Sequence, residues 1–322
     1  AILRVSSYHR RDYDLAVICL AERDHAVITT ISSLQRNCSS SLGVLDQLPV
    51  ELIDIVCLEL DLASLFALRH VSLRGRQIVS ALPEFKLITK YAVSCLHAML
   101  RTGTASGICL CTLWHLFCTS VCSTCQKNFG NTLHLLTWKR YCTTCLRGRV
   151  HKSAVMTVAH ARKQLRLRAP TLRRLPTLKT IPGIYTMEET LHKSSVHLIA
   201  EYHAFSSYRD EHGGAEPAIV RREQQSRNVF MSCCAFPSYD TLTRDVERGI
   251  SCSGCQLISE NQDGLREDLV FLRDKVYSKA SFLKHYEECE GAQRLWNSSD
   301  DGKVQPAELP AWCKIGGYFS SR

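Results

Sequence analysis

The sequence has no apolar run long enough to cross a membrane. Its longest apolar stretch, Ile108 to Val121, contains His115 and falls short of the roughly 20 residues that a transmembrane helix needs. The shorter run Leu15 to Ala21 follows Asp12 and Asp14, which is not typical of a secretory signal. We therefore expect neither a membrane span nor a signal peptide, and we interpret Ile108 to Val121 as a buried helix.

Recognisable catalytic motifs are also missing. The sequence contains no glycine-rich phosphate loop, no nucleophile elbow and no paired-carboxylate motif. It also lacks the complete C-x2–4-C-x12-H-x3–5-H spacing and the repeats of nucleic-acid-binding zinc fingers. We expect a protein that is not an enzyme.

Acidic residues are absent from one segment, between His151 and Lys179. The formal net charge of the chain is +9, and this segment carries eight Lys or Arg residues without a single Asp or Glu. Such a block can bind a phosphate backbone or an acidic protein surface, or it can be the solvated face of a helix. No aromatic residue lies among the charges as base stacking would favour. The role of the block stays open, and its members are Lys152, Arg162, Lys163, Arg166, Arg168, Arg173, Arg174 and Lys179.

Cysteine, in contrast, is abundant, with seventeen residues in 322. A chain of this length can bury a sizeable core without disulfides, so the cysteines indicate metal binding in a reducing compartment, the cytoplasm or the nucleus. The pairs Cys122-x2-Cys125 and Cys142-x2-Cys145, separated by sixteen residues, have the spacing of a structural zinc site. We predict that these four thiolates bind one tetrahedral Zn²⁺.

A second set of ligands lies downstream. Cys252-x2-Cys255 is followed after 29 residues by His285-x3-Cys289. On a helix, His285 and Cys289 are four residues apart on one face, so both side chains can reach an ion held by the first pair. The pattern predicts a second structural Zn²⁺ with a Cys₃His ligand set. An amphipathic helix that includes a core histidine is the alternative.

Residues 45 to 80 have the pattern of three short helices. Pro49 suits the first turn of the first helix, and apolar residues follow at helical spacing. Asp61 and Ser72 are placed to cap the second and third helices. Such a module leaves apolar faces that either a partner or the rest of the chain must cover.

The same residues resemble a known family. Residues 45–52, LDQLPVEL, are similar to the L-x-x-L-P-x-E-L opening of the F-box, and residues 62–65 and 68–72 resemble its middle. The resemblance continues, in patches up to about residue 297, to a group of fungal F-box proteins with cysteine pairs directly after the box. These patches are residues 100–106, 122–130, 139–146, 175–185 and 282–296.

This resemblance implies a function. An F-box docks on the adaptor subunit of a cullin-type ubiquitin ligase, and the rest of the chain selects a protein substrate for degradation. The resemblance implies that the adaptor contacts include Leu48, Pro49, Leu52, Ile55 and Leu65. From the residues alone, these side chains could equally form the core of a helical bundle. Neither the substrate nor the assembly of a ligase follows from the sequence.

Two other functions compete with this one. A RING-type ligase domain also uses eight ligands, but its two sites interleave, whereas 106 residues separate Cys145 from Cys252 here. A basic, zinc-containing nucleic-acid-binding or regulatory protein fits the positive charge and the metal ligands. We keep the second as the alternative.

The expected fold is mostly α, with a short-helix F-box-like module followed by a helical region that carries two structural zinc sites. We expect five segments along the chain. These are an unassigned N-terminal extension (1–43), the F-box-like module (44–90), a helical connector (91–121), a zinc-ribbon-like site (122–148) and a C-terminal helical region with the second zinc and the substrate-binding surface (149–322).

Overall fold

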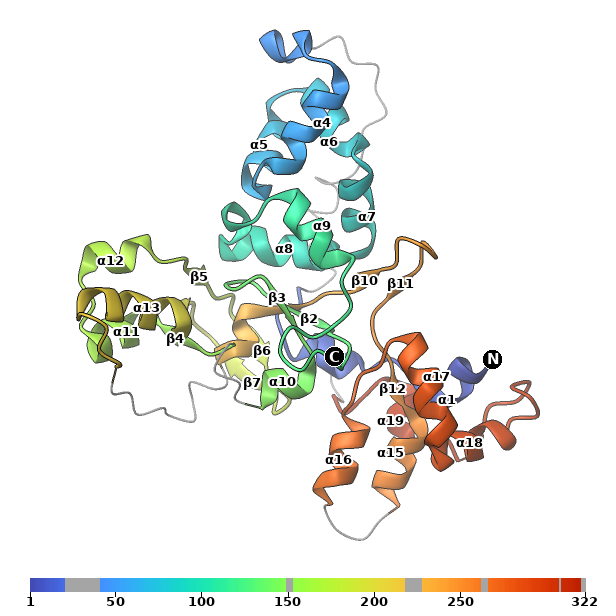
Figure 1. Cartoon of the computed structure of the whole chain (residues 1–322). Coiled ribbons are helices and arrows are strands. Elements are labelled where there is room, and N and C mark those ends of the chain that lie inside the picture. The colour runs from blue at the N-terminus through green and yellow to red at the C-terminus, as the bar shows by residue number, and fades with distance from the viewer. Residues whose placement is uncertain (21–40, 149–152, 218–227, 262–265, 307, 320–322) are drawn as a thin grey trace.

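The computed structural model describes residues 1–20, 41–148, 153–217, 228–261, 266–306 and 308–319. The chain is mostly helical with small two- and three-stranded sheets, as expected. Three lobes extend from a central region (Figure 1). No helix in the described segments is long and apolar enough to span a membrane.

The upper lobe in Figure 1 is a stack of short helices that begins with the F-box-like module. Two of the expected caps are present, because Asp61 Oδ1 accepts from Ser64 N at 3.0 Å and Ser72 Oγ accepts from Gly75 N at 3.0 Å. A Cβ at Gly75 would lie 2.5 Å from the Leu68 carbonyl oxygen, so glycine lets α6 approach α5 closely. The elements are η2 (Gly43–Gln47), α4 (Val50–Glu59), α5 (Leu62–Val71), α6 (Leu73–Ala81), α7 (Pro83–Tyr91), α8 (Val93–Thr102), η3 (Ala105–Gly107) and α9 (Leu110–Phe117).

The central region is a three-stranded antiparallel sheet of order β3-β2-β9, built from segments about 100 residues apart in sequence. Arg140 on β3 is 1% exposed and donates to the carbonyl groups of Gly130, Leu116, Phe236 and Pro237. Its guanidinium therefore joins α9 and the segment after β9 to the sheet. The elements here are β2 (Thr132–His134), β3 (Lys139–Tyr141), α10 (Thr143–Arg147), β6 (Gly183–Tyr185), β7 (Thr190–His192), η4 (Asn228–Ser232), β9 (Cys233–Ala235), β10 (Ser238–Tyr239) and β11 (Val246–Glu247).

The left lobe in Figure 1 has its own small core, formed by residues such as Met156, Leu165, Leu172 and Ile199. It contains most of the basic block, although His151 and Lys152 lie outside the described residues. A sheet of order β4-β8-β5 supports its helices. The elements are β4 (Val155–Thr157), α11 (Val158–Leu165), α12 (Ala169–Arg174), β5 (Leu178–Lys179), β8 (His197–Ala200) and α13 (Glu201–Glu211).

The right-hand lobe joins the two ends of the chain. Strand β1 pairs antiparallel with β12, with Ser7 opposite Cys252, and Ser6 Oγ donates to the Ala292 carbonyl at 3.1 Å. The elements are α1 (Ile2–Ser6), β1 (Ser7–Tyr8), α2 (Arg11–Leu15), β12 (Ser251–Cys252), α15 (Ser253–Glu260), α16 (Glu267–Arg273), α17 (Lys279–Glu288), α18 (Glu290–Asn297) and α19 (Ala311–Ile315).

Two segment boundaries differ from those expected. Residues 1–20, which the sequence pattern left unassigned in an extension, join two parts of the molecule. Strand β1 pairs with β12 in the right-hand lobe, whereas Ala16 and Ile18 are buried in the central core, where Ile18 N donates to the Cys233 carbonyl on β9 at 2.8 Å. The expected single region 149–322 is divided among the left lobe, the central sheet through β9, and the right-hand lobe. Residues 21–40 lie outside the described residues.

One buried carboxylate connects these parts. Asp274 accepts from Arg10 Nη1 at 2.9 Å, from Arg147 Nη1 at 2.8 Å and from Arg273 Nε at 2.9 Å. These arginines come from the N-terminal segment, from the end of α10 and from α16. The pKa of Asp274 is lowered, because the hydrogen bond from Arg273 and the neighbouring arginine charges outweigh the effect of burial.

Asp274→Asn should therefore destabilise the protein. A lowered carboxyl pKa contributes stability above the ordinary value of 3.8 and loses it as the pH falls through the folded value, so the contribution is present at pH 7. Removing one partner of a buried pair typically costs about 3 kcal/mol or more. Denaturant unfolding at pH 7 measures the loss. The exposed Asp268, paired with Arg266, provides the control Asp268→Asn, which should leave stability unchanged; equal stability of both variants would contradict the role of Asp274.

Candidate metal centres

The first cluster lies where the cysteine pairs flank the β2–β3 hairpin. All four ligand atoms of Cys122, Cys125, Cys142 and Cys145 lie within 4.8 Å of one another, and Cys125 Sγ is 3.9 Å from Cys142 Sγ. Sulfurs about 2.3 Å from a tetrahedral ion are about 3.8 Å apart. The arrangement therefore has the dimensions of a four-sulfur metal site, as the spacing predicted.

Local backbone contacts hold these thiols in place. Cys122 N donates to the Asn128 carbonyl at 2.9 Å, and Ser123 N donates to the Arg140 carbonyl at 2.8 Å, so the first turn is fixed to the hairpin. Cys142 caps α10, and its Sγ accepts from Cys145 N at 3.4 Å. An N–H donor to sulfur stabilises a thiolate, which is the form that binds metal.

The second cluster is assembled from three segments of the right-hand lobe. Cys252 and Cys255 flank the start of α15, His285 lies on α17, and Cys289 lies between α17 and α18. Cys289 Sγ is 3.7 Å from Cys252 Sγ and 3.8 Å from Cys255 Sγ, and His285 Nε2 is 3.3 Å from Cys255 Sγ. The predicted Cys₃His set is thus brought together, but only His285 is on the predicted helix, because α17 ends at Glu288 and Cys289 is in extended backbone between α17 and α18.

Close helix packing at two glycines makes this second cluster possible. Gly254 lies between Cys252 and Cys255, and a Cβ at this position would be 2.1 Å from Ala292 N. A Cβ at Gly291 would lie 2.7 Å from the Gly254 carbonyl oxygen. Only glycine lets the first turn of α15 touch the start of α18, and this contact sets Cys289 beside Cys252. The imidazole of His285 is held by the Tyr277 ring, which stacks on it at 4.7 Å.

The proton balance of each cluster favours a bound cation. In the first cluster, hydrogen bonding with Cys142 lowers the pKa of Cys122 to about 4, while the same contact raises the pKa of Cys142. In the second, hydrogen bonds from Cys252 and Cys255 lower the pKa of Cys289, and the pKa of Cys252 is raised. One sulfur in each cluster is thus stabilised as a thiolate by its protonated neighbours. Full ionisation of the clustered ligands requires a positive ion among them.

His134 lies in the sequence between the two pairs but belongs to neither cluster. Its Nδ1 accepts from Leu136 N at 3.3 Å, and its Nε2 is 3.2 Å from Ser232 Oγ. Burial lowers the pKa of His134 to about 4, so the ring is neutral at pH 7. It is a core histidine of the central sheet.

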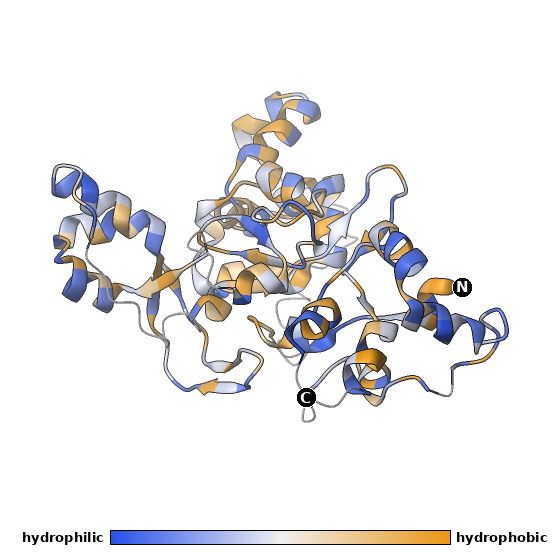
Figure 2. Ribbon diagram, turned by 60° about the horizontal axis from the view of Figure 1, so that its bottom comes forward, coloured by the Kyte–Doolittle hydropathy of each residue, from blue (hydrophilic) through white to orange (hydrophobic). Residues whose placement is uncertain are grey.

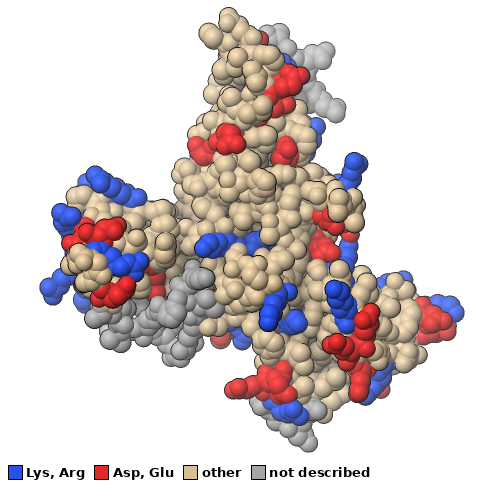
Figure 3. Space-filling model, viewed as in Figure 1, with Lys and Arg blue, Asp and Glu red and all other residues tan. Residues whose placement is uncertain are grey.

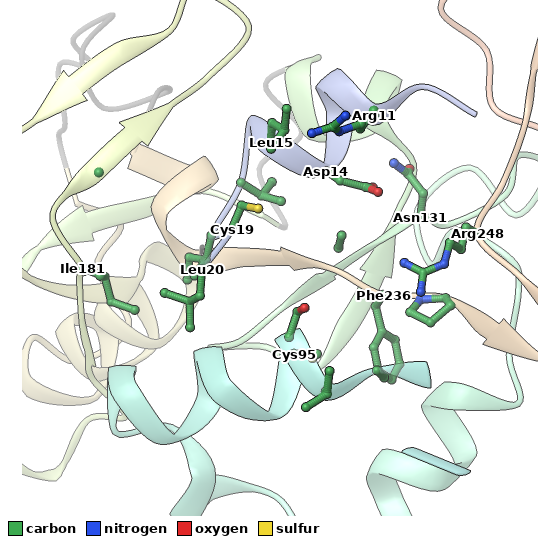
Figure 4. A pocket seen from close by; sticks show the side chains of 18 of the residues that line it. Arg11, Asp14, Leu15, Cys19, Leu20, Cys95, Asn131, Ile181, Phe236 and Arg248 are labelled. Carbon is green, nitrogen blue, oxygen red and sulfur yellow. The ribbon is translucent and has the colours of Figure 1, made fainter. Parts of the chain in front are cut away.

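A large cavity is separate from both clusters. It has a volume of about 940 Å³ and lies where the N-terminal segment, the start of α8 and β6 meet. Figure 4 shows Arg11, Asp14 and Arg248 on one side and Leu20 and Ile181 on the other. Asp14 Oδ2 lies within hydrogen-bonding distance of His9 Nε2, at 2.8 Å.

The five side chains expected to contact an adaptor do not all reach the surface. Leu48, Leu52 and Ile55 are 40%, 47% and 56% exposed, and Pro49 is exposed beside them. Leu65, in contrast, is fully buried in the hydrophobic core. It cannot supply contact surface without rearrangement of the module, so we remove Leu65 from the docking residues.

Sequence reasoning missed Arg140, Asp274 and Trp138. Arg140 lies in the resembling patch 139–146 but received no role from it, and Asp274 belongs to no motif; only the fold shows their long-range partners. Trp138 stands in the left-handed backbone region with φ 52°, which is unusual for so bulky a residue. No spacing rule signals any of the three.

Comparison of the chain with protein families, with curated proteins and with solved structures finds no match. The geometry of the molecule therefore carries the functional argument.

Single substitutions should separate the two clusters. Cys142→Ser should release one metal ion and spare the second site, and His285→Ala should also release one ion, because each removes one of four ligands. His134→Ala should release none. Metal analysis of the purified variants by mass spectrometry gives the stoichiometry. Equal metal loss from His134→Ala and His285→Ala would overturn the assignment.

Proposed function

We propose that this chain is a non-catalytic, F-box-type substrate receptor of a cullin-type ubiquitin ligase, with two structural Zn²⁺ ions. The exposed apolar face of the F-box-like module is the observation that carries the proposal. In this account, the module binds the ligase adaptor and the metal-stabilised remainder binds a protein substrate.

Helix α4 supports the docking role because it is apolar on most of its circumference while only one side is covered. Ile53 and Cys57 are buried in the lobe, whereas Val50, Leu52, Ile55 and Val56 are 47–56% exposed. Apolar residues on all sides are typical of a buried helix. Figure 2 shows hydrophobic residues recurring around the helices of this lobe. An apolar partner that covers α4 would remove this surface from water.

The preceding turn extends the same surface. Val44 and Leu45, on η2, are 77% and 46% exposed, and Leu48 and Pro49 connect them to α4. These residues lie at the outer end of the lobe, away from both metal centres (Figure 1). An adaptor bound there would leave the other two lobes accessible to a substrate.

Zinc is the ion that we propose for both clusters. Thiolate and imidazole ligands in tetrahedral sets of four favour Zn²⁺ over Mg²⁺ or Ca²⁺, which prefer oxygen ligands. Four protein ligands leave no open position for a reactive water, so we assign both ions a structural role. Each set closes on its own pairs, which is unlike the interleaved sites of a RING domain.

Nucleic-acid binding remains the alternative function, because six exposed cations of the left lobe have no carboxylate partner among the described residues. They are Arg162, Lys163, Arg166, Arg173, Arg174 and Lys179. Phosphate contacts weaken steeply as salt rises, whereas an apolar docking interface does not. Salt dependence therefore distinguishes this function from adaptor binding.

Leu52→Ala combined with Ile55→Ala should abolish binding to the adaptor. Buried apolar anchors in an interface commonly contribute about 2 kcal/mol or more each. Co-purification of the full chain with the recombinant adaptor measures the effect. The matched control is Phe271→Ala with Leu283→Ala, which removes two apolar side chains of similar exposure in the right-hand lobe.

The control variant should bind the adaptor like the unmodified chain, and all three proteins should keep the same metal content. Absence of adaptor binding by the unmodified chain would reject the F-box proposal. Undiminished binding by the α4 double variant would reject it as well.

A further inference from the structure

A pocket of about 560 Å³ lies between the central sheet and the left lobe. One wall is the tip of the β2–β3 hairpin with Trp138, and another is the loop between α8 and η3. The third wall comes from the basic lobe and includes Arg174, Pro176 and His203. It is therefore a concave surface shared by two parts of the proposed substrate-binding region.

Trp138 is held in this pocket at a conformational cost. With φ 52° it occupies a position that glycine or asparagine adopts far more easily. Strained residues of this kind tend to occur at functional sites, where the surrounding structure enforces them. The indole packs on Gly107, where a Cβ would lie 3.4 Å from the ring. Trp138 N also donates to the His134 carbonyl at 2.9 Å, which fixes the turn.

The pocket wall carries one cationic side chain and no carboxylate among its lining residues. Arg174, at the end of α12, is exposed on this wall, and the other exposed cations named above belong to the same lobe. Arg168 differs from them, because its Nε is 3.3 Å from Glu211 Oε1. Figure 3 shows Lys and Arg along the top and outer edge of this lobe, and both Lys or Arg and acidic residues across its middle. Burial lowers the pKa of His203, so Arg174 supplies the positive charge at the pocket itself.

We propose that this pocket binds an acidic peptide segment of the substrate, with an apolar side chain on Trp138 and a carboxylate facing Arg174. An aromatic ring beside an arginine suits this mixture, because the ring offers apolar contact area and the guanidinium pairs with carboxylates. The role of the pocket in substrate selection rests on the proposed receptor function. Binding of the peptide itself does not.

Fluorescence anisotropy with the full chain tests this site. The probe is a fluorescein-labelled peptide of twelve residues, with glutamates on both sides of a single phenylalanine; one comparison peptide has lysine in place of glutamate, and another has alanine in place of phenylalanine. The acidic phenylalanine peptide should bind, its affinity should fall as salt rises, and both comparison peptides should bind at least about tenfold more weakly.

Two variants locate the binding. Trp138→Gly and Arg174→Gln should each weaken the acidic peptide about tenfold or more, while Arg244→Gln, an exposed arginine at the β10–β11 turn, should not. Glycine suits the left-handed position, so Trp138→Gly should keep its metal content and unfolding temperature. If Trp138→Gly is destabilised, the peptide affinity of Arg174→Gln tests the site instead, because replacing an exposed side chain should leave the fold unchanged.

Several outcomes would overturn the proposal. These are equal binding of the acidic and lysine peptides, unchanged binding by both variants, or binding of a DNA duplex in place of the acidic peptide. Adaptor co-purification, measured on the same variants, should be unaffected. If the unmodified chain does not bind the adaptor, the receptor function is rejected. If it binds the adaptor but not the acidic peptide, only this site is rejected.

Discussion

The close clustering of Cys and His ligand atoms in two sets is the constraint on which the architecture depends. Seven cysteines and one histidine converge in two sets whose ligand atoms lie within 4.8 Å, and such sets ionise fully only around a cation. Each set also fixes backbone from distant parts of the chain. The first holds the hairpin that β9 joins as a third strand, and the second holds α15, α17 and α18 against the N-terminal strand. A metal ion bound in either set would therefore couple metal binding to folding in that region.

Two buried arginines connect different parts of the molecule through hydrogen bonds. Arg140 donates hydrogen bonds to four carbonyl groups from three segments. Arg10 and Arg147 both donate to Asp274, and Arg147 is the last residue of α10, the helix that Cys142 caps. The first metal centre is thereby connected to the lobe that contains the second. The exposed apolar residues at the outer end of the F-box-like module lie far from both ligand sets, which suits the proposed docking role (Figure 1).

The sequence predicted the features that local rules determine. Both ligand sets, the caps Asp61 and Ser72 and the buried helix around Leu113 follow from spacing and short-range hydrogen bonding. The remaining features depend on contacts distant in sequence. Residues 1–20 have no motif of their own and acquire a role only because Ser7 pairs with Cys252. The burial of Leu65 was not evident either, since a helical pattern does not tell a core face from a docking face. Trp138 occupies a backbone position for which sequence rules would choose glycine.

X-ray absorption at the zinc edge of the purified chain tests the central claim most directly, because it reports the ligands of both ions together. Seven sulfurs and one nitrogen over two sites predict an average shell dominated by sulfur at about 2.3 Å, with a minor nitrogen contribution near 2.0 Å and no bound water. A shell of mostly oxygen or nitrogen ligands, or a chain that is folded without any zinc, would contradict the account.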